Sequence, residues 1–196
     1  YRGAGGAKDL VEARRLFGPA AAQGHSGAQF KLGIMHWFGE GGPVDFAEAR
    51  RIYGLAAAQG HLEAQTNLGS MHLNGQGGPE DFAEARRLYG PAAARGDRHA
   101  QANLGSMNYS GKGGAKDFAE ARRLSGLAAE QGHVRAQFKL GIMHYLGEGG
   151  PVDFAEARRL YGLAVAQGHL EAQTNLGSMH LNGQGGPADF AEARRL

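Results

Sequence analysis

The sequence predicts an all-α protein in which pairs of helices stack into a curved superhelix, a solenoid of 36-residue units. An aspartate and a glycine each recur every 36 residues along a chain of 196. Apolar residues inside each unit follow the period of a helix, and no segment alternates as a strand would. A single pair of short helices cannot bury its apolar faces, so successive pairs must stack. The aspartates are Asp9, Asp45, Asp81, Asp117, Asp153 and Asp189, and the glycines are Gly3, Gly39, Gly75, Gly111, Gly147 and Gly183.

The first helix of a unit is represented by "DFAEARRIYGLAAAQG", residues 45–60. Asp45 is a favourable N-cap, and Glu48 three residues later predicts a capping box. Gly60 is expected to end the helix. The apolar face predicted on a helical wheel comprises Phe46, Ala49, Ile52, Tyr53, Ala56 and Ala57.

The second helix is represented by "HLEAQTNLGSMHLNG", residues 61–75. Ala64, Leu68, Met71 and His72 fall on one side of it. Gly75 is expected to adopt the left-handed conformation of a C-cap. Each unit is therefore predicted to hold two antiparallel helices of about 12 to 14 residues.

The units divide residues 1–196 into a single solenoid array. We number the repeats 9–44, 45–80, 81–116, 117–152 and 153–188 as one to five. Residues 1–8 align with the end of a second helix, and residues 189–196 start a further repeat. We therefore expect an array that continues beyond both ends.

The stretch "GEGGPVDFAEARR" could be taken for a phosphate-binding loop, because a glycine-rich turn leads into a helix N-terminus. However, Asp45 and Glu48 would place two carboxylates where the anion should bind. No Lys-Ser/Thr pair follows the glycines, as a P-loop requires. The loop is therefore interpreted as a connector.

Composition and charge exclude several classes of function. The chain has 21 Lys and Arg against 19 Asp and Glu, which leaves too small an excess to indicate nucleic-acid binding. It has no cysteine, and its nine histidines do not form a zinc signature, so no metal or other cofactor is expected. No nucleophile–base pair or pair of catalytic acids is visible, and no apolar run could span a membrane. We expect a protein that is not an enzyme, without a small-molecule substrate and without direct membrane insertion.

The segment "LGSMHLNGQGGPEDFAEARRLYGPAAARGD" resembles the Sel-1-like repeat family, which is related to the tetratricopeptide repeats. The resemblance rests on the Leu-Gly of the second helix, the Asn-Gly-x-Gly loop, the aspartate start and the Ala-Ala…Gly close of the first helix. It covers the whole chain. It implies a right-handed α/α superhelix, an adaptor role in assembling protein complexes, and a concave side lined by the first helices.

The chain departs from that family pattern at three positions of the repeat. Glycine stands where the family commonly has an apolar residue, at 42, 78, 114, 150 and 186. Histidine stands where it commonly has tyrosine, at 36, 72, 144 and 180. Arginine replaces an apolar residue at Arg50 and its equivalents.

Every first helix carries an arginine pair whose second member points to solvent on the helical wheel. One interpretation is a local pair between that arginine and the glutamate three residues earlier. The other is a ladder of guanidinium groups on a concave groove, suited to carboxylates. The ladder comprises Arg15, Arg51, Arg87, Arg123 and Arg159.

Apolar side chains suggest further contacts for a partner. Leu55, Leu127 and Leu163 fall on the same predicted exposed face as the ladder. Trp37 and Tyr145 belong to stripes that either pack on the adjoining helix or serve as aromatic anchors for a partner.

Taken together, the sequence predicts a non-enzymatic scaffold or adaptor that binds a protein segment on its concave face. The expected partner is an acidic, partly apolar segment or a larger multi-subunit complex, and no nucleic acid. The alternative is a structural linker subunit built into a large protein assembly.

Overall fold

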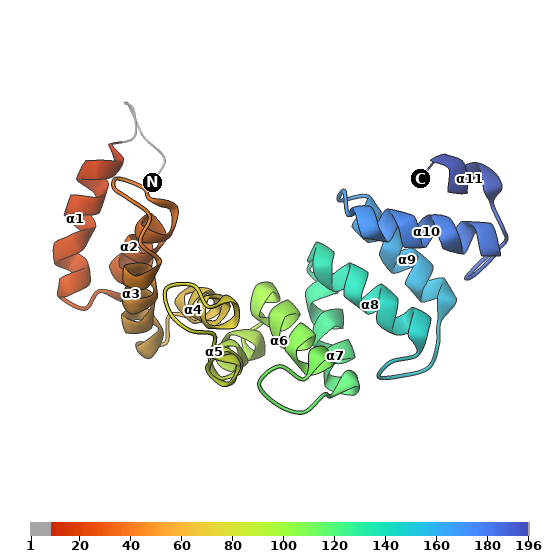
Figure 1. Cartoon of the computed structure of the whole chain (residues 1–196), viewed down its shortest axis with the longest axis horizontal. Helices are drawn as coiled ribbons and strands as arrows, with labels where there is room; N and C mark the ends of the chain where they lie inside the picture. The colour runs from red at the N-terminus through yellow and green to blue at the C-terminus, as the bar shows by residue number, and fades with distance from the viewer. Residues whose placement is uncertain (1–8, 196) are drawn as a thin grey trace. The chain divides into compact units, whose positions relative to one another are not determined.

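The computed structural model describes residues 9–195, which form eleven α-helices and no strand (Figure 1). The all-α prediction is therefore confirmed. Residues 1–8, predicted to end an earlier repeat, lie outside the described residues, as does Leu196. The helices are α1 (Leu10–Ala22), α2 (Ser26–Phe38), α3 (Phe46–Ala58), α4 (Leu62–Asn74), α5 (Phe82–Ala94), α6 (Arg98–Ser110), α7 (Phe118–Glu130), α8 (Val134–Leu146), α9 (Phe154–Val165), α10 (Leu170–Asn182) and α11 (Phe190–Arg195).

The chain divides within α5 into two compact units, one ending at Ala92 and the other beginning at Ala93. In the first unit α2 packs against α1 and α3, and α3 packs against α4. In the second unit each helix from α6 to α11 packs against the next along the chain (Figure 1). Odd-numbered helices are the first helices of the predicted repeats, and even-numbered helices are the second.

The first helices begin at the predicted aspartate N-caps. The Asp45 carboxylate accepts a hydrogen bond from the Glu48 amide at 2.9 Å, and Asp153 does the same for Glu156. The second hydrogen bond of the predicted capping box, from the Asp45 amide to the Glu48 carboxylate, does not form. The Asp45 amide instead donates to the His36 carbonyl at 2.8 Å, which leaves the Glu48 carboxylate available to another partner.

The second helices have N-caps that the sequence analysis did not assign. His61 Nδ1 accepts from the Ala64 amide at 3.4 Å, and His133 Nδ1 accepts from the Ala136 amide at 3.3 Å. Asp97 has this function in repeat three, where its carboxylate accepts from the Ala100 amide at 2.7 Å. A ring nitrogen and a carboxylate oxygen thus satisfy the same free helix donor.

Glycines in the left-handed region end the helices, as predicted. Gly75 has φ of 65° and its amide donates to the Met71 carbonyl, which closes α4. Gly60 has φ of 81° just beyond α3. These conformations would strain any side chain that carries a Cβ.

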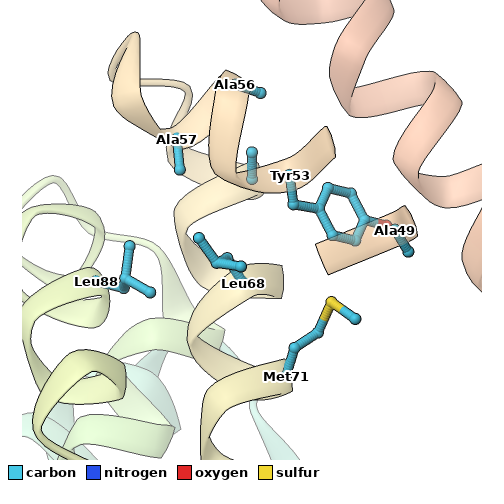
Figure 2. Packing of buried hydrophobic residues seen from close by; sticks show 8 residues of the cluster. Ala49, Tyr53, Ala56, Ala57, Leu68, Met71 and Leu88 are labelled. Carbon is cyan, nitrogen blue, oxygen red and sulfur yellow. The ribbon is translucent and has the colours of Figure 1, made fainter. Parts of the chain in front are cut away.

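The core of the first unit is rich in alanine, which brings the helices close together. Figure 2 shows Leu68, Met71 and Leu88 in one buried cluster with Tyr53. The ring of Tyr53 lies against Gly33 of α2, where an added Cβ would stand 2.6 Å from it. The glycine of the Leu-Gly dipeptide therefore makes room for a buried tyrosine of the next helix. The second unit repeats this arrangement with Gly141 and Tyr161.

One member of the predicted apolar face is not buried. Phe46 remains 38% exposed at the start of α3, whereas Ala49, Ile52 and Tyr53 are buried. Its ring packs edge-on against Trp37, with ring centroids 5.0 Å apart. Phe46 lies at the edge of the apolar face because it is the first residue of the helix.

Candidate protein-binding surface

The second arginine of each pair makes a two-pronged ion pair with the glutamate three residues earlier. Arg51 Nε and Nη2 donate to the Glu48 carboxylate at 2.8 and 2.7 Å. This hydrogen bond is the main reason that the pKa of Glu48 lies below its usual value and that of Arg51 above it. An exposed pair of this kind contributes only about 0.2–0.5 kcal/mol to a helix.

The same pair recurs on every first helix from α1 to α9, and its arginine stays accessible. Across the five pairs, 58% to 71% of the arginine side chain is exposed. Each arginine therefore keeps surface that a partner could contact while it remains bonded to its own glutamate. The pairs are Arg15 with Glu12, Arg51 with Glu48, Arg87 with Glu84, Arg123 with Glu120 and Arg159 with Glu156.

Leucines lie four residues after the arginine on three of these helices. Leu55 of α3, Leu127 of α7 and Leu163 of α9 are all exposed, at 44%, 36% and 39%. A glycine precedes each leucine, and a Cβ added at Gly54 or Gly126 would meet nothing within 4 Å. Within each unit, we call the exposed side of the first helices, with its arginines, leucines and glycines, the arginine face.

The second unit has two hollows on this face. One has a volume of about 320 Å³ and is lined by Gly126, Arg159 and Leu163 together with residues of α8. The other, of about 530 Å³, lies beside Arg123 and Leu127. Part of the arginine face of the second unit is therefore hollowed.

Trp37 and Tyr145 lie in contacts within the chain. Trp37 packs on the core cluster of the first unit, and Tyr145 on the cluster around Tyr161. The Tyr145 hydroxyl also accepts a hydrogen bond from the Gln184 side-chain amide at 3.1 Å. Packing on the adjoining helix thus accounts for most of the surface of both rings.

The first arginine of each pair has a different environment from the second. Arg50 donates from Nη2 to Nδ1 of His72 at 2.9 Å, and from Nη1 to the Pro79 carbonyl at 3.1 Å. Arg122 repeats this with His144 and the Pro151 carbonyl, at 2.8 and 3.2 Å. We call this arrangement of arginine, histidine and loop carbonyl the arginine clamp. It ties the first helix of a repeat to the second helix and the glycine loop of the same repeat.

The clamp explains all three departures from the family pattern. Arginine and histidine are its two side chains, and the loop glycine leaves space for the guanidinium. A Cβ at Gly78 would overlap Nη1 of Arg50, and one at Gly150 would overlap Nη1 of Arg122. A polar cluster therefore occupies the place that the family pattern fills with apolar side chains.

The clamp histidines favour the neutral form. Burial lowers the pKa of His72 and of His144, and the adjacent arginine lowers each further, against a smaller opposing effect of nearby carboxylates. A neutral ring suits the geometry, because Nδ1 must be unprotonated to accept from the guanidinium. Among residues 9–195, histidine, aspartate and glutamate form no group of three that could hold a metal ion.

The sequence of the chain matches one protein-family model. The family model described as "Sel1 repeat" matches the whole chain, as the segments 1–25, 26–61, 62–97, 98–133, 134–169 and 170–196. The chain belongs to the Sel1 repeat family. These segments begin at or next to the second helix of each repeat as numbered here, so they divide the array in a different phase.

Two solved structures of Sel1 repeat proteins are similar to this one. The first is c5321, described as a protective antigen of uropathogenic Escherichia coli strains that displays an SLR fold, with a TM-score of 0.87 and 34% identity. The match covers 93% of this chain but only 39% of that antigen. The second is a Sel1 repeat protein from Oxalobacter formigenes, with a TM-score of 0.84 and 30% identity, over 96% of this chain and 75% of that one. No curated protein sequence matches the chain.

The family assignment supports the coarse functional prediction. Sel1 repeats commonly form protein-interaction scaffolds and are typically non-catalytic. Protein partners are therefore the class that this fold suggests. No helix in the described part of the chain is long and apolar enough to cross a membrane.

Proposed function

We propose that this Sel1 repeat chain is a non-enzymatic adaptor that binds an acidic, partly apolar protein segment on the arginine face. The observation that carries the proposal is that an accessible arginine and an exposed leucine occur together on three first helices, α3, α7 and α9. Exposed leucines on an otherwise well-packed helix indicate a surface that another molecule covers.

The glycines of the arginine face support close approach of the partner backbone. A mid-helix glycine costs roughly 0.5–1 kcal/mol relative to alanine. No neighbouring atom within the structure requires glycine at positions 54, 90, 126 or 162, because an added Cβ would meet nothing within 4 Å at any of them. A partner that packs against the helix there would account for that cost.

Carboxylates of the partner would compete with the local glutamates for the arginines. Each guanidinium has five N–H donors, and Glu48 takes two of those of Arg51. The remaining donors can bind a second carboxylate, with a gain of about 1–3 kcal/mol if the contact is desolvated. Trp37 and Tyr145 contribute their accessible edges as secondary anchors in this proposal.

The test begins with affinity capture of partners and their identification by mass spectrometry. The Arg87→Glu/Arg123→Glu variant should keep its helicity and bind the captured partner at least tenfold more weakly. Binding by the native chain should weaken as salt rises. If the double variant folds and binds as tightly as the native chain, the arginine face is not the interaction surface.

A linker role in a permanent assembly is the second candidate, and one observation favours it. Phe38 and Val44 in repeat one, and Leu146 and Val152 in repeat four, expose more than half of their surface at the loop edge. A linker deprived of its neighbours should aggregate, whereas an adaptor should stay monodisperse alone. Light scattering of the isolated chain distinguishes these two outcomes.

A further inference from the structure

A cluster of basic side chains lies at the turn edge of the second unit, outside the arginine face. It consists of Arg98 and His99 at the start of α6, with His133 and Arg135 at the start of α8. The rings of His99 and His133 meet edge to face, with centroids 5.1 Å apart. Arg98, His99 and Arg135 are exposed, and His133 is half-buried. We call these four residues the basic cluster.

Two other repeats have an acidic residue at the corresponding position. In repeat two, His61 Nδ1 lies 3.2 Å from the Glu63 carboxylate, and in repeat five His169 is as close to Glu171. The position of this glutamate is taken by His99 in repeat three and by Arg135 in repeat four. The basic cluster therefore lies where histidine and arginine replace the glutamate of repeats two and five.

The charges that act on His133 are positive. Burial lowers its pKa most, followed by the effects of His99, Arg98 and Arg135. Asp97, which precedes α6, caps that helix at the Ala100 amide, and Glu130 ends α7. The turn after α9 contributes the neutral Gln167, whose amide donates to Gln137. Arg98 Nη1 donates to the Gln131 carbonyl at 3.4 Å, and no carboxylate among residues 9–195 is seen bonded to the cluster.

We propose that Arg98, His99, His133 and Arg135 bind a phosphate monoester carried by a soluble protein segment. The two guanidinium groups bring two positive charges, which one carboxylate cannot balance. A phosphate monoester carries about −1.5 to −2 charges at pH 7 and offers three acceptor oxygens. Arginine forks match this group in geometry, and each imidazole supplies a further donor. A protein carrier is chosen because Sel1 repeats commonly bind proteins.

This site is independent of the arginine face proposed above. Its ligand would be recognised by charge and oxygen geometry, and no exposed leucine accompanies it. Loss of binding at one surface should leave binding at the other unchanged, so each proposal can fail without the other.

The probe for the test is N-acetyl-O-phosphoserine methylamide, titrated into the full chain while the imidazole signals are followed by NMR. The signals of His99 and His133 should shift, and the phosphate should raise the pKa of His133 because it favours the charged ring. The titration is carried out above pH 7, because the phosphate loses negative charge as it takes up a proton near pH 6. The unphosphorylated serine probe and acetate at equal concentration should shift neither signal.

The matched variant is His99→Glu/Arg135→Glu, which restores the carboxylates found at the same position in repeats two and five. The fold should tolerate it, because Glu63 and Glu171 occupy equivalent helix starts. Its affinity for the probe should fall roughly tenfold or more. The Arg159→Glu variant removes a cation from the arginine face of the same unit and should bind the probe normally.

Four results would overturn the proposal. They are unchanged imidazole signals, equal binding by the double variant, equal binding of acetate, and binding to phosphatidic acid vesicles without binding to the phosphoserine probe. The last result would show that the site binds a lipid headgroup and not a phosphorylated protein segment.

Discussion

Two neighbouring arginines in each first helix lie in opposite environments. Arg122 is half-buried and bonds to His144 of the second helix and to a loop carbonyl of its own repeat. Arg123, the next residue, is exposed and bonds to Glu120 of its own helix. The helix turns by about 100° between them, which is enough to move a side chain from the interface with the second helix to solvent.

This difference shows which of the two arginines stabilises the fold. Removing Arg122 leaves a partly buried imidazole and a loop carbonyl without their donor, and unsatisfied groups are costly. Removing Arg123 frees a glutamate that water can solvate, so the loss is small. The first arginine thus links the two helices and the loop of one repeat, whereas the second is available for a partner.

The largest effect is expected at Gly149, the loop glycine next to the one that faces the clamp. Gly149 has φ of 71°, and a Cβ there would overlap the Phe118 carbonyl of α7. The Gly149→Ala variant should therefore lose about 2–4 kcal/mol of unfolding free energy. Urea titration followed by circular dichroism measures this loss. A variant as stable as the native chain would show that the loop does not pack as tightly on α7.

A second effect is expected from pH, through His36, His72 and His144. Their pKa values are lowered in the folded chain, mainly by burial and then by the adjacent arginine. The unfolded chain therefore takes up protons first as the pH falls below about 6.5, and stability should decrease from there through the lower folded pKa values. The free energy of unfolding measured from pH 7.5 to 5 should show this decline.

The control for the pH effect replaces all three histidines with glutamine, which can accept the arginine hydrogen bond but does not titrate in this range. The decline should become shallower, with a remainder from His133, whose pKa is also lowered. An equally steep decline in the triple variant would show that the clamps are not its cause.

The smallest effect is expected on the arginine face, and it has the opposite sign. Gly126 lies in the middle of α7 with open space around its Cα, so Gly126→Ala should stabilise the chain by about 0.5–1 kcal/mol. The same substitution should weaken partner binding if the partner backbone approaches this glycine. A loss of stability would contradict the open geometry, and thermal unfolding detects either sign.

Much of the fold could be predicted from the sequence, because its signals are local. Asp45 and Gly75 bound their helices as predicted, since capping depends on residues within one turn. Only one of the two hydrogen bonds of the predicted capping box forms, because the Asp45 amide bonds to the His36 carbonyl of the preceding helix. Periodicity within one helix does not reveal that contact.

The clamp could not be derived from spacing, because its members come from three segments. Arg50, His72 and Gly78 meet only when α3, α4 and the following loop pack together. The available signal was that three departures from the family pattern recur with one period. The histidine N-caps of the second helices had a clearer signal, because Asp97 stands at the same position in repeat three.

Arg122→Gln and Arg123→Gln test most directly whether the first arginine of a pair stabilises the fold and the second binds the partner. For each variant, unfolding free energy and affinity for the captured partner are measured on the same preparation. Arg122→Gln should lose about 1–3 kcal/mol of stability. Arg123→Gln should stay within about 0.5 kcal/mol of the native chain yet bind the partner more weakly. If the two variants lose stability equally, or if only Arg122→Gln loses affinity, the assignment of the two arginines is contradicted.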